Sequence, residues 1–143
     1  MKRIIPAAVL TCFAVAASLL ALPQKHPSVA PGVPETSAEQ LHCMLGRNGK
    51  VLVLDVRTSQ EYARGHIPGA VNVPIEILVR KIRQMKVSKG TTVVTMCDYG
   101  GRSSRAAMEL RKMGYQATSF CRIESWRKDG YKIRKGNTKP QTE

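Results

Sequence analysis

The stretch Val93-Val94-Thr95-Met96-Cys97-Asp98-Tyr99-Gly100-Gly101-Arg102-Ser103-Ser104-Arg105 decides the fold and carries the candidate chemistry. Four β-prone or apolar residues lead into a cysteine, a short turn with two glycines follows, and helical spacing begins at Ser103. This order predicts a strand, a tight loop and the start of a helix. Such a loop directs backbone N–H groups inward, and the helix adds the positive end of its dipole, so an anion is favoured there.

Cys97, at the entrance of this loop, is the candidate nucleophile. Loop amides and the helix dipole favour the thiolate, which is the form of cysteine that attacks. Arg102 closes the loop and can offer a planar guanidinium to an oxyanion. The alternative is an inert cysteine at the end of a buried strand, but two glycines and an arginine are poor core residues. The expected substrate-binding residues are therefore those of the loop: Asp98, Tyr99, Gly100, Gly101, Arg102 and Ser103.

The pattern Cys97-x-x-Gly100-x-Arg102-Ser103 resembles the active-site loop of the rhodanese (thiosulfate sulfurtransferase) family. A second stretch, from Leu54 to Pro74, is similar to that family's other signature. The two motifs stand in the family's order, and the resemblance covers most of residues 37–130. It implies a single rhodanese-like domain with an α/β fold, in which a small, mostly parallel sheet is flanked by helices on both faces.

The resemblance also implies an activity. A sulfurtransferase of this family would take a sulfane sulfur from thiosulfate or a persulfide onto Cys97 and pass it to cyanide or a thiol. Its partners would be a small anionic sulfur donor and that acceptor. Asp55 and Arg57 follow a strand, where side chains line the ligand crevice of open α/β sheets; the resemblance implies instead a supporting role, with the Asp55 carboxylate bracing backbone around the loop.

Two other functions compete with sulfur transfer. A phosphatase or arsenate reductase also uses a cysteine–arginine loop, but Cys97 to Arg102 occupies six positions, whereas the related phosphatases have seven. A non-catalytic sulfur-carrier or binding module would keep the fold without rapid turnover.

His66 is a candidate general base, but a preformed thiolate needs no base, and this histidine lies in a turn motif. No metal or organic cofactor is implied, because the cysteines lack the paired spacing of a zinc site.

The length and composition of the chain limit the number of domains and the kind of partner it can have. A chain of 143 residues with 43% hydrophobic content supports one domain with one core. The net charge of +13 is spread along the chain and indicates an electropositive surface that attracts anions. Nucleic acid is not favoured as a partner, because no basic platform interleaved with aromatic residues is present.

The chain divides into four segments. Lys2 and Arg3 precede the apolar run up to Leu22, so residues 1–22 are expected to be a signal peptide or, failing cleavage, an N-terminal membrane anchor. Either predicts a periplasmic or otherwise exported protein, and the intact mass of the protein from its host would decide between them. Residues 23–36 are a proline-rich linker, 37–131 the domain and 132–143 a basic tail.

Within the domain, patterning predicts alternating helices and strands. Ser37 and Thr58 are expected to cap short helices, and an amphipathic helix is expected from Pro74 to Met85. Strands are expected at 51–54, 71–73 and 115–120, and a helix from Ser103 to about Met113. Beside the first helix's exposed His42, Cys43 is expected to be half-buried. The sequence departs from the family pattern near the end of the domain. Similar proteins commonly have two glycines some residues before the tryptophan that corresponds to Trp126. This chain has Cys121-Arg122-Ile123-Glu124 there, and the segment looks shortened.

Overall fold

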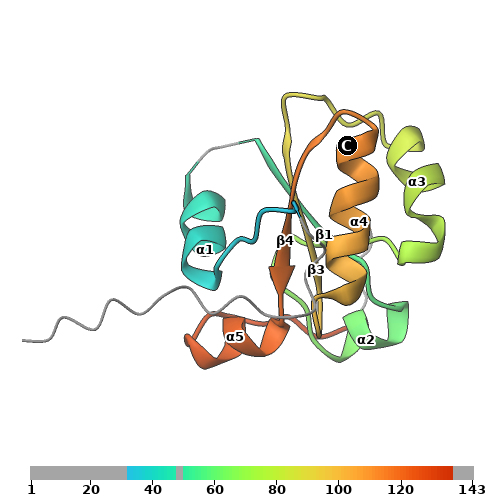
Figure 1. Ribbon diagram of the computed structural model, residues 1–143. Helices are drawn as coiled ribbons and strands as arrows, with labels where there is room; N and C mark the ends of the chain where they lie inside the picture. The colour runs from blue at the N-terminus through green and yellow to red at the C-terminus, as the bar shows by residue number, and fades with distance from the viewer. Residues whose placement is uncertain (1–31, 48–49, 137–143) are drawn as a thin grey trace, which may run out of the picture.

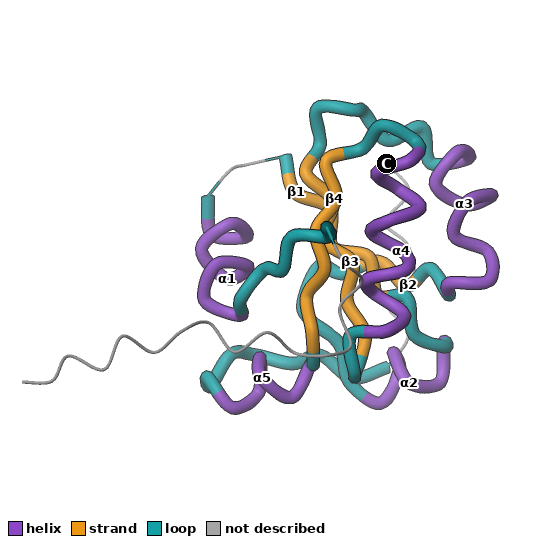
Figure 2. The backbone as a smooth tube through the Cα atoms, in the orientation of Figure 1, coloured by secondary structure: helices purple, strands orange, loops and turns teal. Residues whose placement is uncertain are grey.

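The computed structural model describes residues 32–47 and 50–136. The expected signal segment, most of the linker and the last seven residues of the tail lie outside this range. Figures 1 and 2 show a central sheet with helices on both sides. The helices and strands, in chain order, are α1 Ala38–Gly46, β1 Val51–Asp55, α2 Ser59–Arg64, β2 Val71–Asn72, the 3-10 turn η1 Ile75–Ile77, α3 Leu78–Gln84, β3 Thr92–Cys97, α4 Gly101–Lys112, β4 Gln116–Cys121 and α5 Ile123–Lys128.

The sheet has four strands in the order β2-β1-β3-β4, and every neighbouring pair is parallel. After β1 the chain moves to one side of that strand to form β2, and then to its other side to form β3. The carboxyl ends of β1 and β3 therefore flank the point where the strand order reverses, which is where open α/β sheets bind ligands. Cys97 ends β3 at this edge and pairs in backbone register with Cys121 of β4.

Helices cover both faces of the sheet, as the sequence predicts. α3 and α4 lie over one face, whereas α1 and α5 lie over the other (Figure 1). Two buried clusters correspond to these faces. The first joins sheet residues such as Leu54 and Val93 to Ile82 and Leu110 of the covering helices. The second packs the opposite side of the sheet and includes Leu41, Val53, Met96, Phe120 and Trp126.

The two predicted helix starts are confirmed as reciprocal capping boxes. Ser37 caps α1 with Gln40, and Thr58 caps α2 with Glu61. The expected helix over 74–85 differs from the structure: it begins as the 3-10 turn η1 and becomes α-helical only at Leu78. α4 begins at Gly101, two residues before the expected start, so the loop after Cys97 is correspondingly shorter.

Gly100 makes this tight loop possible. It is the N-cap of α4 with φ +86°, in the left-handed region that favours glycine. Gly101 is already helical, and a Cβ built there would meet no atom within 4 Å. Only the first of the two glycines is therefore required by the backbone. Within residues 32–47 and 50–136, no helix is long and apolar enough to cross a membrane.

Candidate active site

Cys97 lies at the bottom of the loop and is buried, with 1% of the residue exposed. Its Sγ accepts hydrogen bonds from the backbone N–H groups of Gly100 (3.1 Å) and Ser103 (3.3 Å). The second of these groups belongs to the first turn of the 12-residue helix α4, so the helix dipole points its positive end at the sulfur. Two backbone N–H donors and the positive end of a helix dipole therefore converge on Sγ.

Buried hydroxyl groups support the loop from below. Ser103 Oγ accepts from the Cys97 thiol at 3.3 Å, donates to the Gly100 carbonyl oxygen at 3.1 Å and lies 2.9 Å from Ser119 Oγ. Thr95 Oγ1 donates to the Ser103 carbonyl oxygen at 2.8 Å. Ser103, Ser119 and Thr95 are fully buried. The sequence predicted Ser103 in the loop but not this network, which fixes the start of α4 relative to β3 and β4.

Asp55 and Arg57 form a buried brace at the end of β1. Arg57 Nε donates to Asp55 Oδ1 (2.9 Å), and Arg57 Nη2 donates to Asp55 Oδ2 (2.6 Å) and to the Gly65 carbonyl oxygen (2.7 Å). Its Nη1 reaches Asp98 Oδ1 at 3.1 Å. Burial alone would lower the pKa of Arg57, but its bonds to Asp55 and Asp98 outweigh that effect and raise it. The pair thus ties the residue after Cys97 to the turn that follows α2.

Arg102 lies at the loop, but its guanidinium is already held by a partner that the sequence analysis missed. Nη1 and Nη2 donate to the two carboxylate oxygens of Glu61 at 2.8 and 2.7 Å, and Nη2 lies 3.6 Å from Asp98 Oδ2. Glu61 Oε2 also accepts from the Thr58 backbone N–H at 2.8 Å. Glu61 therefore has two tasks, since it caps α2 and joins that helix to the loop.

The ion pair between Glu61 and Arg102 makes the free energy of unfolding depend on pH. The hydrogen bonds from Arg102 hold the pKa of Glu61 well below its usual 4.5, and those from Thr58 act in the same direction. A carboxylate with a lowered folded-state pKa contributes stability that is complete above the unfolded pKa and is lost as the pH falls toward the folded pKa.

We therefore expect Glu61→Gln to destabilise the protein most near neutral pH. The difference in unfolding free energy between wild type and variant should shrink as the pH falls from about 4.5 toward 2. Urea unfolding of both proteins across this pH range measures it. A difference that stays constant down to the lowest pH would mean that the charge of Glu61 does not stabilise the fold.

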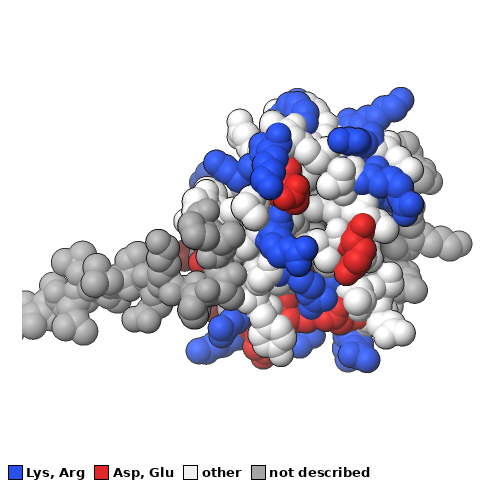
Figure 3. Space-filling view, turned by 45° about the vertical axis from the view of Figure 1, so that its right-hand side comes forward, with Lys and Arg blue, Asp and Glu red and all other residues white. Residues whose placement is uncertain are grey.

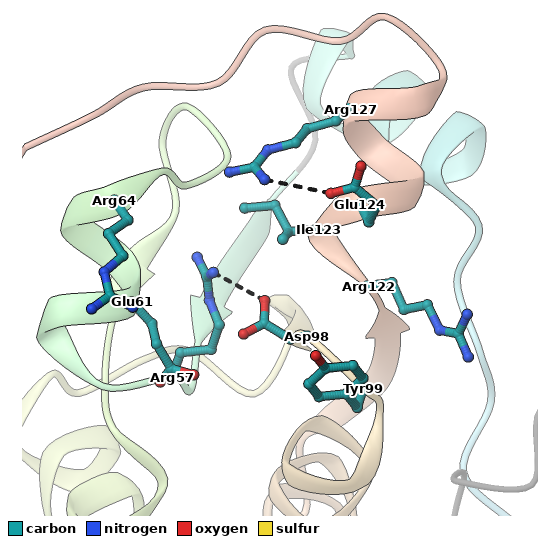
Figure 4. A pocket seen from close by; sticks show the side chains of 9 residues that line it. All are labelled: Arg57, Glu61, Arg64, Asp98, Tyr99, Arg122, Ile123, Glu124 and Arg127. Atoms are coloured by element: carbon teal, nitrogen blue, oxygen red, sulfur yellow. Dashed lines mark hydrogen bonds and ion pairs between the residues drawn. The ribbon is translucent and has the colours of Figure 1, made fainter.

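A cavity of about 490 Å³ opens beside the loop (Figure 4). Its lining comes from the end of β1, from α2, from the loop and from the start of α5: Arg57, Glu61, Arg64, Asp98, Tyr99, Arg122, Ile123, Glu124 and Arg127. Tyr99 is 77% exposed at the loop tip. The structure thus brings the predicted Asp98, Tyr99 and Arg57 together with three arginines whose part in the pocket no sequence pattern indicated.

The remaining chemistry-bearing residues lie apart from this pocket. His66 is fully buried, its ring Nδ1 hydrogen-bonds the Tyr62 carbonyl oxygen at 3.0 Å, and the ring stacks on that of Tyr62. Cys43 is exposed rather than half-buried, because its helix packs on the sheet through Leu41. His42 stacks on Tyr131 at a centroid distance of 4.2 Å. Among the described residues, no group of His, Cys, Asp and Glu is arranged to hold a metal ion.

Basic side chains are distributed over the face that carries α4, with acidic side chains between them (Figure 3). This matches the electropositive but dispersed surface that the composition predicts.

Comparison with known proteins matches residues 37–126 to the rhodanese-like domain. A sulfurtransferase from Allochromatium vinosum is 34% identical over 103 residues, which cover 71% of this chain and 94% of that protein. Thiosulfate sulfurtransferase PspE from Escherichia coli is 34% identical over 62 residues, which cover 43% of this chain and 60% of that protein. The solved structure of a rhodanese-related protein from Thermoplasma volcanium has a TM-score of 0.63 at 26% identity, covering 71% of this chain and 97% of that one. The matches thus span nearly all of two known proteins and less than two thirds of the third.

Proposed function

The chain belongs to the rhodanese-like domain family, and we propose that it transfers a sulfane sulfur through a persulfide on Cys97. The observation that carries this proposal is the position of Cys97 Sγ, which accepts two backbone N–H groups at the N-terminus of α4. Sulfur transfer is the general activity of the relatives' family.

In the first half of the reaction, Cys97 thiolate attacks the outer sulfur of thiosulfate. A sulfur–sulfur bond forms to Cys97, the sulfur–sulfur bond within thiosulfate breaks, and sulfite leaves with the electron pair. In the second half, cyanide or a thiolate attacks the outer sulfur of the persulfide. Thiocyanate or a new persulfide forms, and Cys97 leaves as the thiolate, ready for another cycle.

The loop stabilises negative charge at both stages. The amides of Gly100 and Ser103 and the dipole of α4 act on the sulfur without rearrangement, because the backbone is already fixed by Gly100 and the buried hydroxyls. PspE, named as a thiosulfate sulfurtransferase, supports thiosulfate as the donor.

The phosphatase or arsenate reductase alternative fits the site less well. Its loop from Cys97 to Arg102 occupies six positions, one fewer than in the related phosphatases, so the cradle around Sγ is narrower than a phosphate or arsenate group bound whole within it requires. A carrier module remains the second candidate, since it would use the same cysteine and differ only in speed.

Incubating the purified protein with thiosulfate and measuring its intact mass tests the proposal. We expect the mass to rise by one sulfur atom, and cyanide to remove that sulfur and release thiocyanate over many turnovers. Loading followed by release of one equivalent only would indicate the carrier. No added sulfur on any cysteine would contradict sulfur transfer from thiosulfate.

A further inference from the structure

Cys121 is a second cysteine beside Cys97 in the sheet, and the proposed sulfur transfer does not use it. The two residues are partners at the end of the parallel pairing between β3 and β4. Partners on adjacent strands are roughly 4.7–4.9 Å apart, and disulfides join residues whose Cα atoms are about 4.4–6.8 Å apart. The spacing of the two backbones therefore allows a bond between these cysteines.

Both cysteines take positions on the face of the sheet that α4 covers. Ser119 lies two residues before Cys121 on β4, and its Oγ is 2.9 Å from Ser103 Oγ of α4. Cys97 is on the same face, since its thiol donates to Ser103 Oγ at 3.3 Å. Residues of a strand alternate between the two faces, so Cys121 shares the face of Ser119. Phe120, between them, packs on the opposite face, as this alternation requires.

The backbone after Cys121 holds this position against strain. Arg122 has a φ of +72° and a ψ of 104°, in a region that glycine occupies far more easily than a residue with a side chain. Its backbone N–H donates to the Cys97 carbonyl oxygen at 3.1 Å, so hydrogen bonding between the strands continues past Cys121. Such a conformation persists only where the surrounding structure fixes it. The end of β4 is therefore tied to the nucleophile.

A persulfide on Cys97 would have two sulfur atoms that differ in access. The inner one, Sγ, belongs to a residue that is 1% exposed and accepts the backbone N–H groups of Gly100 and Ser103. An acceptor from solvent therefore meets the outer sulfur first. A nucleophile that attacks the inner sulfur has to come from within the protein, and Cys121 is the cysteine at the adjoining position of the sheet.

We propose that Cys121 resolves the Cys97 persulfide when no acceptor arrives, which gives the protein a second activity, the release of the transferred sulfur as sulfide. The proposal rests on the proposed function, which supplies the persulfide. The Cys121 sulfur attacks Cys97 Sγ, a disulfide forms between the two residues, and the bond from Sγ to the outer sulfur breaks. The outer sulfur leaves with the electron pair and takes up the proton of the Cys121 thiol, so hydrosulfide is released. The sulfane sulfur is reduced as the two cysteines become a disulfide, and no external oxidant is needed.

The disulfide stops further sulfur transfer, because Cys97 no longer has a free thiolate. A dithiol reductant restores both thiols, and the net reaction then converts thiosulfate and the dithiol into sulfite, sulfide and the oxidised dithiol. Cyanide or a thiol acceptor removes the outer sulfur before this step and keeps the protein active. The cysteine pair thus makes the activity of the loop depend on the supply of acceptor.

A single-turnover experiment without acceptor tests the proposal. The full chain is reduced, freed of reductant and mixed with thiosulfate under nitrogen. We expect the mass of wild type first to rise by one sulfur atom, and then to fall as one equivalent of sulfide appears and two thiols are lost. Peptide mapping without reduction should find Cys97 and Cys121 joined. Cys121→Ser should stop at the added sulfur and release no sulfide.

Cys43→Ser is the matched control. Cys43 is exposed on α1, which covers the opposite face of the sheet from α4, so this variant should release sulfide as wild type does. Incubation with thiosulfate alone should lower the later rate with cyanide by about tenfold or more in wild type, and dithiothreitol should restore it. Cys121→Ser should keep its rate after the same treatment.

Three results would overturn the proposal: a wild-type persulfide that persists without sulfide release, added sulfur located on Cys121, or a disulfide that involves Cys43. If Cys121→Ser fails to fold, the peptide map of wild type decides alone. Wild type that takes up no sulfur and releases no sulfite would instead refute the proposed function.

Discussion

Cys97→Ser should abolish sulfur transfer from thiosulfate to cyanide, with a loss of about a thousandfold or more. Serine fits the same space and can accept the same N–H groups of Gly100 and Ser103, so the fold should be retained. Its hydroxyl stays protonated and forms no persulfide, so the first half of the reaction cannot occur. Thiocyanate release and the mass gain after thiosulfate treatment measure the two consequences separately.

The other cysteines provide matched controls for this result. Cys43 is exposed on α1, on the helix layer away from α4, so Cys43→Ser should keep the full rate. Cys121 is the informative case, because its backbone pairs in register with that of Cys97. Survival of turnover in Cys97→Ser together with its loss in Cys121→Ser would contradict the assignment of the nucleophile. Loss in both would show that the reaction uses a cysteine pair.

Much of the fold could be predicted because its signals are local. Ser37 and Thr58 each carry a capping partner three residues later, so the starts of α1 and α2 are encoded within one turn. The continuous apolar run Val51–Leu54 predicts a strand covered on both faces, and β1 is one of the two central strands of the sheet. The β-prone and apolar residues before Cys97 predict the other central strand, β3. The expected strand over 115–120 is one residue displaced from β4, because strand ends depend on pairing with β3 rather than on apolar character.

The partner of Arg102 could not be predicted in this way. Glu61 lies 41 residues earlier in the chain, and its local pattern already explains it fully as a capping residue. Nothing in that pattern indicates that the same carboxylate reaches a loop after another strand. The strained backbone of Arg122 is equally hidden, although the absence of the glycines that similar proteins commonly have at this segment was the available signal. Both features arise where strand ends meet, and only the fold brings those ends together.

Arg102→Ala should lower the rate of sulfur transfer by about a hundredfold. The comparison is with the loss of one preorganised oxyanion donor, which costs roughly 3 kcal/mol, and the loop amides remain in place. Arg102→Lys keeps the charge but not the fork that matches a carboxylate, so it should recover only part of the rate. Initial rates with thiosulfate and cyanide measure both variants.

Substitution of Glu61, the ion-pair partner of Arg102, distinguishes two ways in which Arg102 can contribute to the rate. If the guanidinium contributes by its charge near Cys97, then Glu61→Gln, which keeps a hydrogen-bond acceptor and leaves the arginine in place, should cost much less than Arg102→Ala. The double variant should then resemble Arg102→Ala alone, because residues in one ion pair are not additive. A loss in Glu61→Gln as large as in Arg102→Ala would mean that the arginine serves only to hold α2 against the loop. The charge that stabilises the departing sulfite would then come from the loop amides and α4 alone.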